Sequence, residues 1–302
     1  MIKKLQKKTN FIIISLVIST CVLMIANGLW FSPDQFFVLA GLLMLIFGRF
    51  KNYLKDWTLP VFLLLLYDYL RGILPHLAAL PHVNPMVKFG MLKGFIWGVM
   101  LQRYLSSDQL LHWYDFVVVF LYMTHFVIPM IISLIFWLNN RKLFKEYMYS
   151  LVVLSYLALI SFVLFPTMPP WMAAQSGYIP HLDNLYDFII DYFPHSFYLP
   201  SVYQWIDNNL VAALPSMHAA YPWLTFLYLR KVYPKFQFAL ILYVISIWFT
   251  TLYLGEHYSL DIIVAILYAQ FTYMIITRRK SIFKKVNYIL GNHKLWKAKN
   301  DF

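Results

Sequence analysis

Charged residues and cysteine are both scarce in this sequence. Only 13% of the 302 residues are charged, whereas about a quarter are charged in an ordinary soluble domain. Hydrophobic residues make up 61%, and the mean hydropathy is +0.62. This balance excludes a typical water-soluble protein and predicts an integral membrane protein. Cys21 is the single cysteine, which excludes an intramolecular disulfide.

The sequence also lacks linkers rich in glycine, serine or proline, and it contains no repeat of fixed period. We therefore expect one all-α domain, a polytopic membrane helix bundle. An apolar helix of roughly 20 residues crosses a bilayer core. By this criterion about eight spans are expected, at residues 11–30, 35–48, 58–74, 116–138, 147–166, 213–230, 236–254 and 257–277.

Two further segments need a separate interpretation. Residues 1–25 begin with a basic stretch, as a signal peptide does, but the apolar run is long and no small-x-small cleavage site follows. We expect this segment to be a retained first span. Residues 86–105 are apolar but carry three cations, which favours an interfacial or re-entrant helix over a span.

Acidic residues are few, with 13 of them against 25 lysines and arginines, so the net charge is +12. In the eight-span arrangement, 21 of the 25 cations fall on one side of the membrane. The positive-inside rule makes that side the cytoplasm. We therefore expect a multi-pass protein of the cell membrane with both termini in the cytoplasm. The charge then reflects topology and does not imply a nucleic-acid partner.

Two histidine motifs begin apolar runs on the predicted extracytoplasmic side. In PSMHAAYP, Ser216 is the expected N-cap of a helix and His218 lies in its first turn, where free N–H groups favour an anion such as phosphate. In GEHYSLDIIVA, His257 and Asp261 are four residues apart and share one helical face. An aspartate that accepts from one ring nitrogen makes the other a better nucleophile or base. Two spans and a short turn separate the motifs, so we expect them to form one site.

Together, Pro-Ser-x-His and the later His-x-x-x-Asp resemble the type 2 phosphatidic acid phosphatase superfamily. In that family the second histidine is the nucleophile that becomes phosphorylated, the first is the acid for the leaving group, and the aspartate orients the nucleophile. The resemblance implies these roles for His257, His218 and Asp261. It also implies a six-helix phosphatase-like core and chemistry without a metal or other cofactor.

The chain departs from most members of the superfamily in two places. Thr250 and Thr251 stand where Ser-Arg would precede the nucleophile, and no Lys-x6-Arg-Pro motif occurs. It is more similar to a branch resembling fungal inositol phosphorylceramide synthase. That similarity covers roughly residues 60–275 and is carried by YDYLRG (67–72), HFVIP (125–129) and FPTMPPW (165–171).

Other residues are candidates for binding the substrate. Arg71 lies near the outer end of its predicted span and can bind phosphate in a bidentate manner; snorkelling to headgroups is the alternative. Ser216 is the second predicted phosphate ligand. Further contacts to substrate or acceptor are predicted at His125, Lys93 and Tyr258. The acidic outer loop 167–212 is expected to cap the site, with Trp171 at its rim.

These expectations divide the chain into N-terminal spans (1–56), a catalytic membrane domain (57–277) and a basic cytoplasmic tail (278–302). The predicted activity is transfer of a phosphoryl or phospho-headgroup unit from a lipid at the extracytoplasmic face, through a phosphohistidine. The donor would be a membrane phospholipid or polyprenyl phosphate, and the acceptor a lipid or polyol.

Three alternatives remain open. With water as acceptor, the protein would be a lipid-phosphate or polyprenyl-pyrophosphate phosphatase. His218, His257 and Asp261 could instead be ligands in an intramembrane metalloenzyme, although no His-Glu-x-x-His motif occurs. The third alternative is a non-catalytic lipid transporter, against which the absence of a clear inverted repeat argues.

Overall fold

The computed structural model describes residues 2–26, 33–77, 97–106, 110–192 and 210–278. Within these ranges the structure is helical, apart from an isolated bridge between Thr167 and Ala212, which confirms the predicted all-α bundle. The labelled elements are α1 (Ile2–Ala26), α2 (Pro33–Ile46), α3 (Phe50–Leu77), α5 (Trp97–Leu105), α6 (Trp113–Asn139), α7 (Arg141–Leu164), α8 (Pro170–Gln175), α9 (Leu185–Ile190), α10 (Met217–Val232), the 3-10 turn η3 (Pro234–Phe236) and α11 (Gln237–Tyr253). A final helix covers Ser259–Arg278.

Five helices in the described part of the chain are long and apolar enough to cross a membrane. These are α3, α6, α7, the continuous segment from η3 through α11, and the final helix. The remaining predicted spans correspond in position to α1, α2 and α10, of which α2 and α10 are shorter. The described helices thus form a polytopic bundle in which the apolar runs of the sequence became helices.

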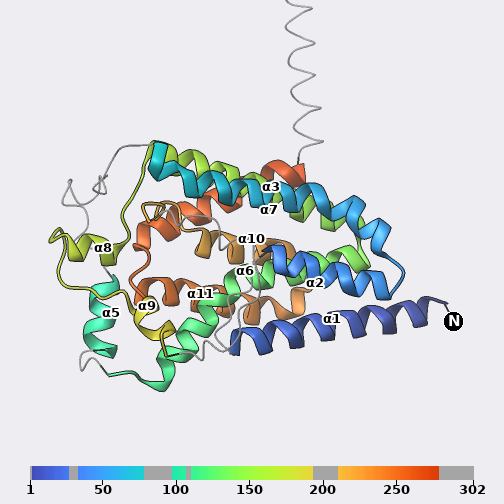
Figure 1. Ribbon diagram of the computed structural model, residues 1–302, viewed down its shortest axis with the longest axis horizontal. Coiled ribbons are helices and arrows are strands. Elements are labelled where there is room, and N and C mark those ends of the chain that lie inside the picture. The colour runs from blue at the N-terminus through green and yellow to red at the C-terminus, as the bar shows by residue number, and fades with distance from the viewer. Residues whose placement is uncertain (1, 27–32, 78–96, 107–109, 193–209, 279–302) are drawn as a thin grey trace, which may run out of the picture.

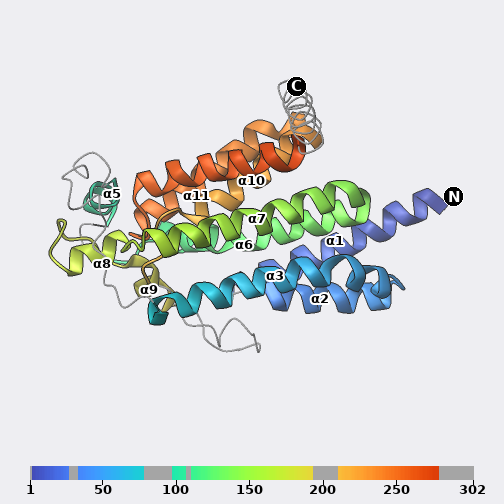
Figure 2. The same ribbon diagram turned by 90° about the horizontal axis from the view of Figure 1, so that it is seen from above.

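Helix α6 is central to the bundle. It packs against α1, α2, α7, α9, α10 and α11. Figure 2 shows α6 and α7 between α2 and α3 on one side and α10 and α11 on the other. The buried positions of α6 include Tyr122, His125 and Ser133, which lie among large apolar side chains. The Ser133 hydroxyl donates to the Pro129 carbonyl of α6 itself, whereas the Tyr122 hydroxyl reaches His218 of α10.

The cation-rich turns gather at one end of the bundle. Arg49, in the turn before α3, donates to Asn10 of α1 at 2.8 Å. Asp56 of α3 accepts from the Trp137 indole at 3.1 Å and pairs with Arg141 at the start of α7. The hydroxyl of Tyr228, near the end of α10, donates to the Glu146 carbonyl of α7 at 3.1 Å. These contacts bring the turns α2–α3, α6–α7 and α10–α11 together.

The short helices α5, α8 and α9 gather at the opposite end (Figure 1). Helix α5 is too short to span a bilayer, and it exposes Trp97, Met100 and Tyr104 while burying Gln102. This agrees with an interfacial helix in the second half of the segment 86–105; residues 86–96 lie outside the described ranges. The starts of α10 and of the final helix also lie at this end, so it carries the histidine motifs.

Candidate active site

The two histidine motifs meet as predicted. His218 is the second residue of α10, and His257 lies in the turn between α11 and the final helix. Nδ1 of His218 is 2.9 Å from Nε2 of His257, which is a hydrogen-bonding distance. The two histidines are 39 positions apart, and the chain between them folds as two antiparallel helices, α10 and α11, which return it to the same end of the bundle.

The other ring nitrogen of His257 faces oxygen atoms. Its Nδ1 lies 3.0 Å from the Ala213 carbonyl oxygen and 3.5 Å from Oδ2 of Asp261. A carbonyl only accepts, so Nδ1 carries the proton in the neutral ring. The lone pair is then on Nε2, the nitrogen that points at His218. His257 is 5% exposed and Asp261 is fully buried, which shields this arrangement from water.

The structure corrects one detail of the prediction. The final helix begins at Ser259, so His257 lies two residues before it, and His257 and Asp261 do not share a helical face. Asp261 sits in the first turn, where its Oδ2 accepts from the Tyr258 N–H at 2.9 Å. Its own carbonyl accepts from the Ser216 N–H at 3.2 Å. The turn before the helix places the His257 ring close to the Asp261 carboxylate. The hydrogen bond from Ser216 to Asp261 links the two histidine motifs directly.

Ser216 and Tyr258 take clear structural positions. Ser216 is the N-cap of α10, and its side chain accepts from the Ala219 N–H at 3.2 Å, as predicted. Ser216 is fully buried. The Tyr258 side chain is 1% exposed. Capping by Ser216 holds the first turn of α10, and therefore His218, in place.

Tyr122 of α6 is a site residue that sequence reasoning missed. Its hydroxyl lies 2.7 Å from Nε2 of His218, and the two rings stack with centroids 4.6 Å apart. His125, one turn later on α6, is fully buried with its ring centroid 4.1 Å from that of His218. The i, i+3 spacing of Tyr122 and His125 places them on one face of the helix. This spacing was the signal available in the sequence once His125 was assigned to the site.

These contacts determine which atom donates and which accepts in each hydrogen bond of the site. Nδ1–H of His257 donates to Ala213, so Nε2 of His257 accepts from Nδ1–H of His218. Nε2 of His218 then carries a lone pair and accepts from the Tyr122 hydroxyl. The lone pair on Nε2 of His257 therefore faces the Nδ1–H of His218. A phosphoryl group bound between the rings would meet the attacking nitrogen on one side and the donor on the other.

Arg71 lies on α3, beside the histidines. Its side chain is 21% exposed, and its Nε is 3.8 Å from Oδ1 of Asp68. Its positive charge reaches the rings of both His125 and His218. Arg71 is thus a cation within electrostatic range of the site. Lys93, the other predicted contact, lies outside the described residues.

The FPTMPPW segment braces the site from outside. Thr167 donates its N–H to the Val211 carbonyl at 2.7 Å and accepts from the Ala213 N–H at 3.1 Å, which positions the carbonyl that binds His257. Trp171 donates its N–H to the Gly255 carbonyl at 3.1 Å. Gly255 has a φ of +79°, and a Cβ there would lie 2.8 Å from the Asp183 carbonyl oxygen. Only glycine fits this turn.

Thr250 and Thr251 do not replace the missing arginine. Both are fully buried in the last turn of α11, and their hydroxyls donate to carbonyls of the same helix, those of Ile247 and Trp248. The Thr251 carbonyl accepts from the His257 N–H at 3.2 Å. These threonines therefore support the turn and contribute no charge.

Acidic groups surround the outer side of the site. Burial raises the pKa of Glu256 to about 7, with the charge of His257 lowering it and that of Asp187 raising it. Burial also raises the pKa of Asp187, helped by Asp191. The ring of Tyr186 on α9 packs at a tilt against that of Tyr122 with centroids 5.3 Å apart, so the acidic loop contacts the site it was predicted to cap. Among the described residues, no group of three or more His, Cys, Asp or Glu side chains is placed to hold a metal ion.

A family model described as the PAP2 superfamily matches residues 87–275, which include both histidine motifs and more than half of the chain. The chain belongs to the PAP2 superfamily. A similar curated protein is inositol phosphorylceramide synthase from Candida albicans (strain SC5314 / ATCC MYA-2876), 24% identical over 153 residues. The alignment covers 46% of this chain and 31% of that protein. No solved structure matches.

These findings confirm the resemblance inferred from the motifs. They also confirm the predicted class, a membrane enzyme of the lipid phosphatase and phosphotransferase type. Within this PAP2 chain, the structure brings His218, His257, Asp261, Ser216 and His125 together as predicted. Arg71 lies nearby, and Tyr122 and the Ala213 carbonyl complete the arrangement.

Proposed function

We propose that this PAP2 chain transfers a phosphoryl or phospho-headgroup unit from a membrane lipid to an alcohol, through a phosphohistidine on His257. The observation that carries the proposal is the hydrogen bond between the two histidines, with Nδ1 of His257 turned toward Ala213 and Asp261. That geometry leaves a lone pair on Nε2 of His257, which attack at phosphorus requires. The lone pair faces the Nδ1–H of His218, which can protonate a leaving group.

In the first step, Nε2 of His257 attacks phosphorus and the P–O bond to the leaving group breaks. His218 gives its Nδ1 proton to the departing oxygen. Asp261 and the Ala213 carbonyl stabilise the positive charge that develops on His257. Arg71 and the first turn of α10 offset the negative charge on the phosphoryl oxygens, which is the main requirement of phosphoryl transfer.

In the second step, an acceptor hydroxyl attacks the phosphohistidine. His218 now takes the proton of that hydroxyl as general base, and the P–N bond to His257 breaks. The free enzyme is thereby restored. The proposed acceptor is an alcohol because the similar protein from Candida albicans is named as a synthase of a phosphorylated ceramide. The substrates are proposed to be membrane lipids at the extracytoplasmic face.

The test uses the purified full chain in lipid nanodiscs with phosphate-labelled membrane phospholipids. Wild-type protein should move the label into a new lipid and carry a phosphohistidine that is stable in alkali and lost in acid. His257→Ala should abolish both signals, whereas His181→Ala, at an exposed histidine paired with Asp183, should keep both.

Each alternative gives a distinct result. Release of inorganic phosphate without a new lipid would identify a phosphatase. Activity lost in excess chelator would identify a metalloenzyme. Full turnover by His257→Ala would contradict the mechanism, and a lack of turnover with any labelled lipid in wild-type protein would favour a transporter.

A further inference from the structure

Basic side chains gather around Asp56 at the end of the bundle away from the histidines. The Asp56 side chain is 11% exposed; it pairs with Arg141 of α7, and its Oδ1 lies 3.9 Å from Nζ of Lys145. The guanidinium of Arg141 also lies over the Trp137 ring, 3.9 Å from the ring centroid. Arg141 is thus held by a carboxylate and an aromatic face, yet its side chain remains 44% exposed.

Arg49, in the turn before α3, brings a second guanidinium to this group. It donates to the side-chain oxygen of Asn10 at 2.8 Å. Asn10 is 5% exposed, and its own amide donates to the Leu138 carbonyl at 3.2 Å. Because Asn10 is neutral, this hydrogen bond orients Arg49 without cancelling its charge. The charge of Arg49 reaches Arg141, so two cations are held within electrostatic range of each other.

The local charge is strongly positive. Residues 49–56 and 141–146 contain six cations and two acids, Asp56 and Glu146. The positive-inside rule explains why cations lie at this end of the bundle. It does not explain why Arg49 and Arg141 are oriented by side chains from three other places in the fold, on α1, α3 and α6.

Two oriented guanidinium groups suit a phosphate ligand. Each guanidinium can donate two parallel hydrogen bonds to phosphate oxygens, and its planar geometry fixes the direction of those bonds. Lysines add charge without that directionality. Lys145, 58% exposed, and the exposed Lys55 lie on either side of Asp56. An anionic group bound here would offset the excess positive charge that Asp56 leaves.

The surface next to the cations is apolar and follows α3 into the membrane. Lys55, Leu59 and Phe62 have the i, i+4, i+7 spacing of one helical face. Leu59 is 53% exposed and Phe62 is 58% exposed. At 1.5 Å per residue, Phe62 lies about 10 Å along the helix axis from Lys55. An acyl chain attached to a phosphate at the cations could therefore lie along this face, which a free phosphate ion would not use.

We propose that this basic cluster binds the phosphate headgroup of an anionic membrane lipid whose acyl chain lies along α3. The cluster consists of Arg49, Lys55, Arg141 and Lys145. In the predicted orientation the lipid belongs to the cytoplasmic leaflet, whose surface is negatively charged. The binding site lies at the opposite end of the bundle from the histidines, and it is independent of the phosphohistidine chemistry.

Photolabelling of the purified full chain in nanodiscs tests this site. The probe is phosphatidylglycerol with a diazirine in one acyl chain, and the reference is zwitterionic phosphatidylcholine with the same chains. Below saturation, phosphatidylglycerol should label the peptide that contains Leu59 and Phe62 at least tenfold more than phosphatidylcholine does. Excess inorganic phosphate should not displace the probe, because it lacks the acyl chain.

Two charge-matched double variants separate a site from a general attraction. Arg49→Gln combined with Lys145→Gln should lower the labelling about tenfold to thirtyfold, since each cation near a membrane surface contributes about a factor of five. Arg230→Gln combined with Lys235→Gln removes the same charge from exposed positions in the α10–α11 turn at the same end. This control should change the labelling less than twofold.

Equal losses in the two double variants would overturn the proposal, because they would show only a general attraction of this end for anionic lipid. Equal labelling by the two lipids, or displacement by inorganic phosphate, would also overturn it. Thermal unfolding shows whether each variant is folded. If the first double variant does not fold, Lys55→Gln, at an exposed position, should still lower the labelling about fivefold. His257→Ala should label as wild type does, so a failure of the proposed reaction would leave this result readable.

Discussion

The chemistry of the site depends on which nitrogen of each histidine carries its proton. For His257 the answer comes from a backbone group, the Ala213 carbonyl, which accepts from Nδ1 whatever the charge of Asp261. For His218 it comes from Nε2 of His257, which accepts from Nδ1–H, and from Tyr122, whose hydroxyl donates to Nε2. Both rings are thereby held in the Nδ1–H tautomer. The two rings are hydrogen-bonded to each other, and in the proposed mechanism a phosphoryl group replaces that bond.

Tyr122→Phe tests this view at the scale of a single residue. Without the hydroxyl, Nε2 of His218 loses its donor, and the preference for the Nδ1–H tautomer weakens because it then rests on the bond to His257 alone. A neutral hydrogen bond contributes about 1 kcal/mol, so kcat should fall about five- to tenfold while the KM of the donor changes little. Nitrogen NMR of the histidine rings should show a mixture of tautomers at His218 in the variant.

Tyr147→Phe is the matched control for this change. Tyr147 of α7 is also fully buried and is also bonded through its hydroxyl, to Thr225 at 2.6 Å. Thr225 lies two turns after His218 on α10, away from the histidines. Loss of the Tyr147 hydroxyl should lower stability and leave the His218 tautomer unchanged. An unchanged tautomer in Tyr122→Phe would show that Tyr122 only packs against the site.

At the scale of elements, Gln102 of the short helix α5 makes hydrogen bonds to two other segments of the chain. The Gln102 amide donates to the carbonyls of Asp183 and Tyr253, each at 2.9 Å, and accepts from the Asp183 N–H at 2.9 Å. Gly98, one turn earlier, packs so closely that a Cβ would lie 2.6 Å from the Leu252 carbonyl oxygen. Gln102 thus links α5, the acidic loop and the end of α11, immediately before the turn that carries His257.

Gln102→Leu should loosen this connection. The substitution keeps the apolar volume but leaves two buried carbonyls and an N–H without their partner, at a cost of about 1–3 kcal/mol for each group that stays dry. We expect α5 and the acidic loop to open locally, so hydrogen exchange in residues 97–105 should rise at least tenfold. Met100→Leu, at an exposed position on the same helix, should leave exchange unchanged. Equal protection in both variants would show that α5 is held by other contacts.

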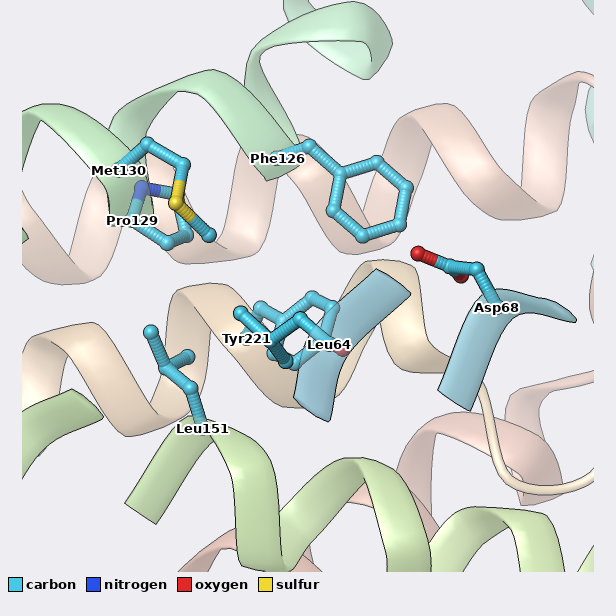
Figure 3. A pocket seen from close by; sticks show the side chains of 7 residues that line it. All are labelled: Leu64, Asp68, Phe126, Pro129, Met130, Leu151 and Tyr221. Atoms are coloured by element: carbon cyan, nitrogen blue, oxygen red, sulfur yellow. The ribbon is translucent and has the colours of Figure 1, made fainter. Parts of the chain in front are cut away.

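The sequence predicted this molecule best where a local pattern determines structure. Apolar runs became helices, Ser216 became an N-cap, and the hairpin of α10 and α11 brought His218 to His257. It failed where backbone geometry decides: no pattern of side chains indicates the Ala213 carbonyl, or that His257 precedes its helix. The small cavity lined by Leu64, Asp68 and Tyr221 could not be predicted either, because it depends on how α3 and α10 pack against α6 and α7 (Figure 3).

The whole molecule separates its charges between two ends, and this separation leads to the last prediction. The turns α2–α3, α6–α7 and α10–α11 lie at the end away from the histidines and carry the cations Arg49, Lys51, Lys55, Arg141, Lys142, Lys145, Arg230, Lys231 and Lys235. Because cations are retained in the cytoplasm, the site end should face outward.

Single cysteines test this orientation in intact cells, since the native Cys21 is buried. Ser176→Cys, exposed after α8 at the site end, should react with a membrane-impermeant maleimide. Lys142→Cys, exposed at the other end, should react only after the cells are permeabilised. The reverse pattern would place the histidines in the cytoplasm, and the lipid donor would then have to come from the inner leaflet. Reaction of both cysteines without permeabilisation would contradict a membrane-spanning arrangement with the two ends on opposite sides.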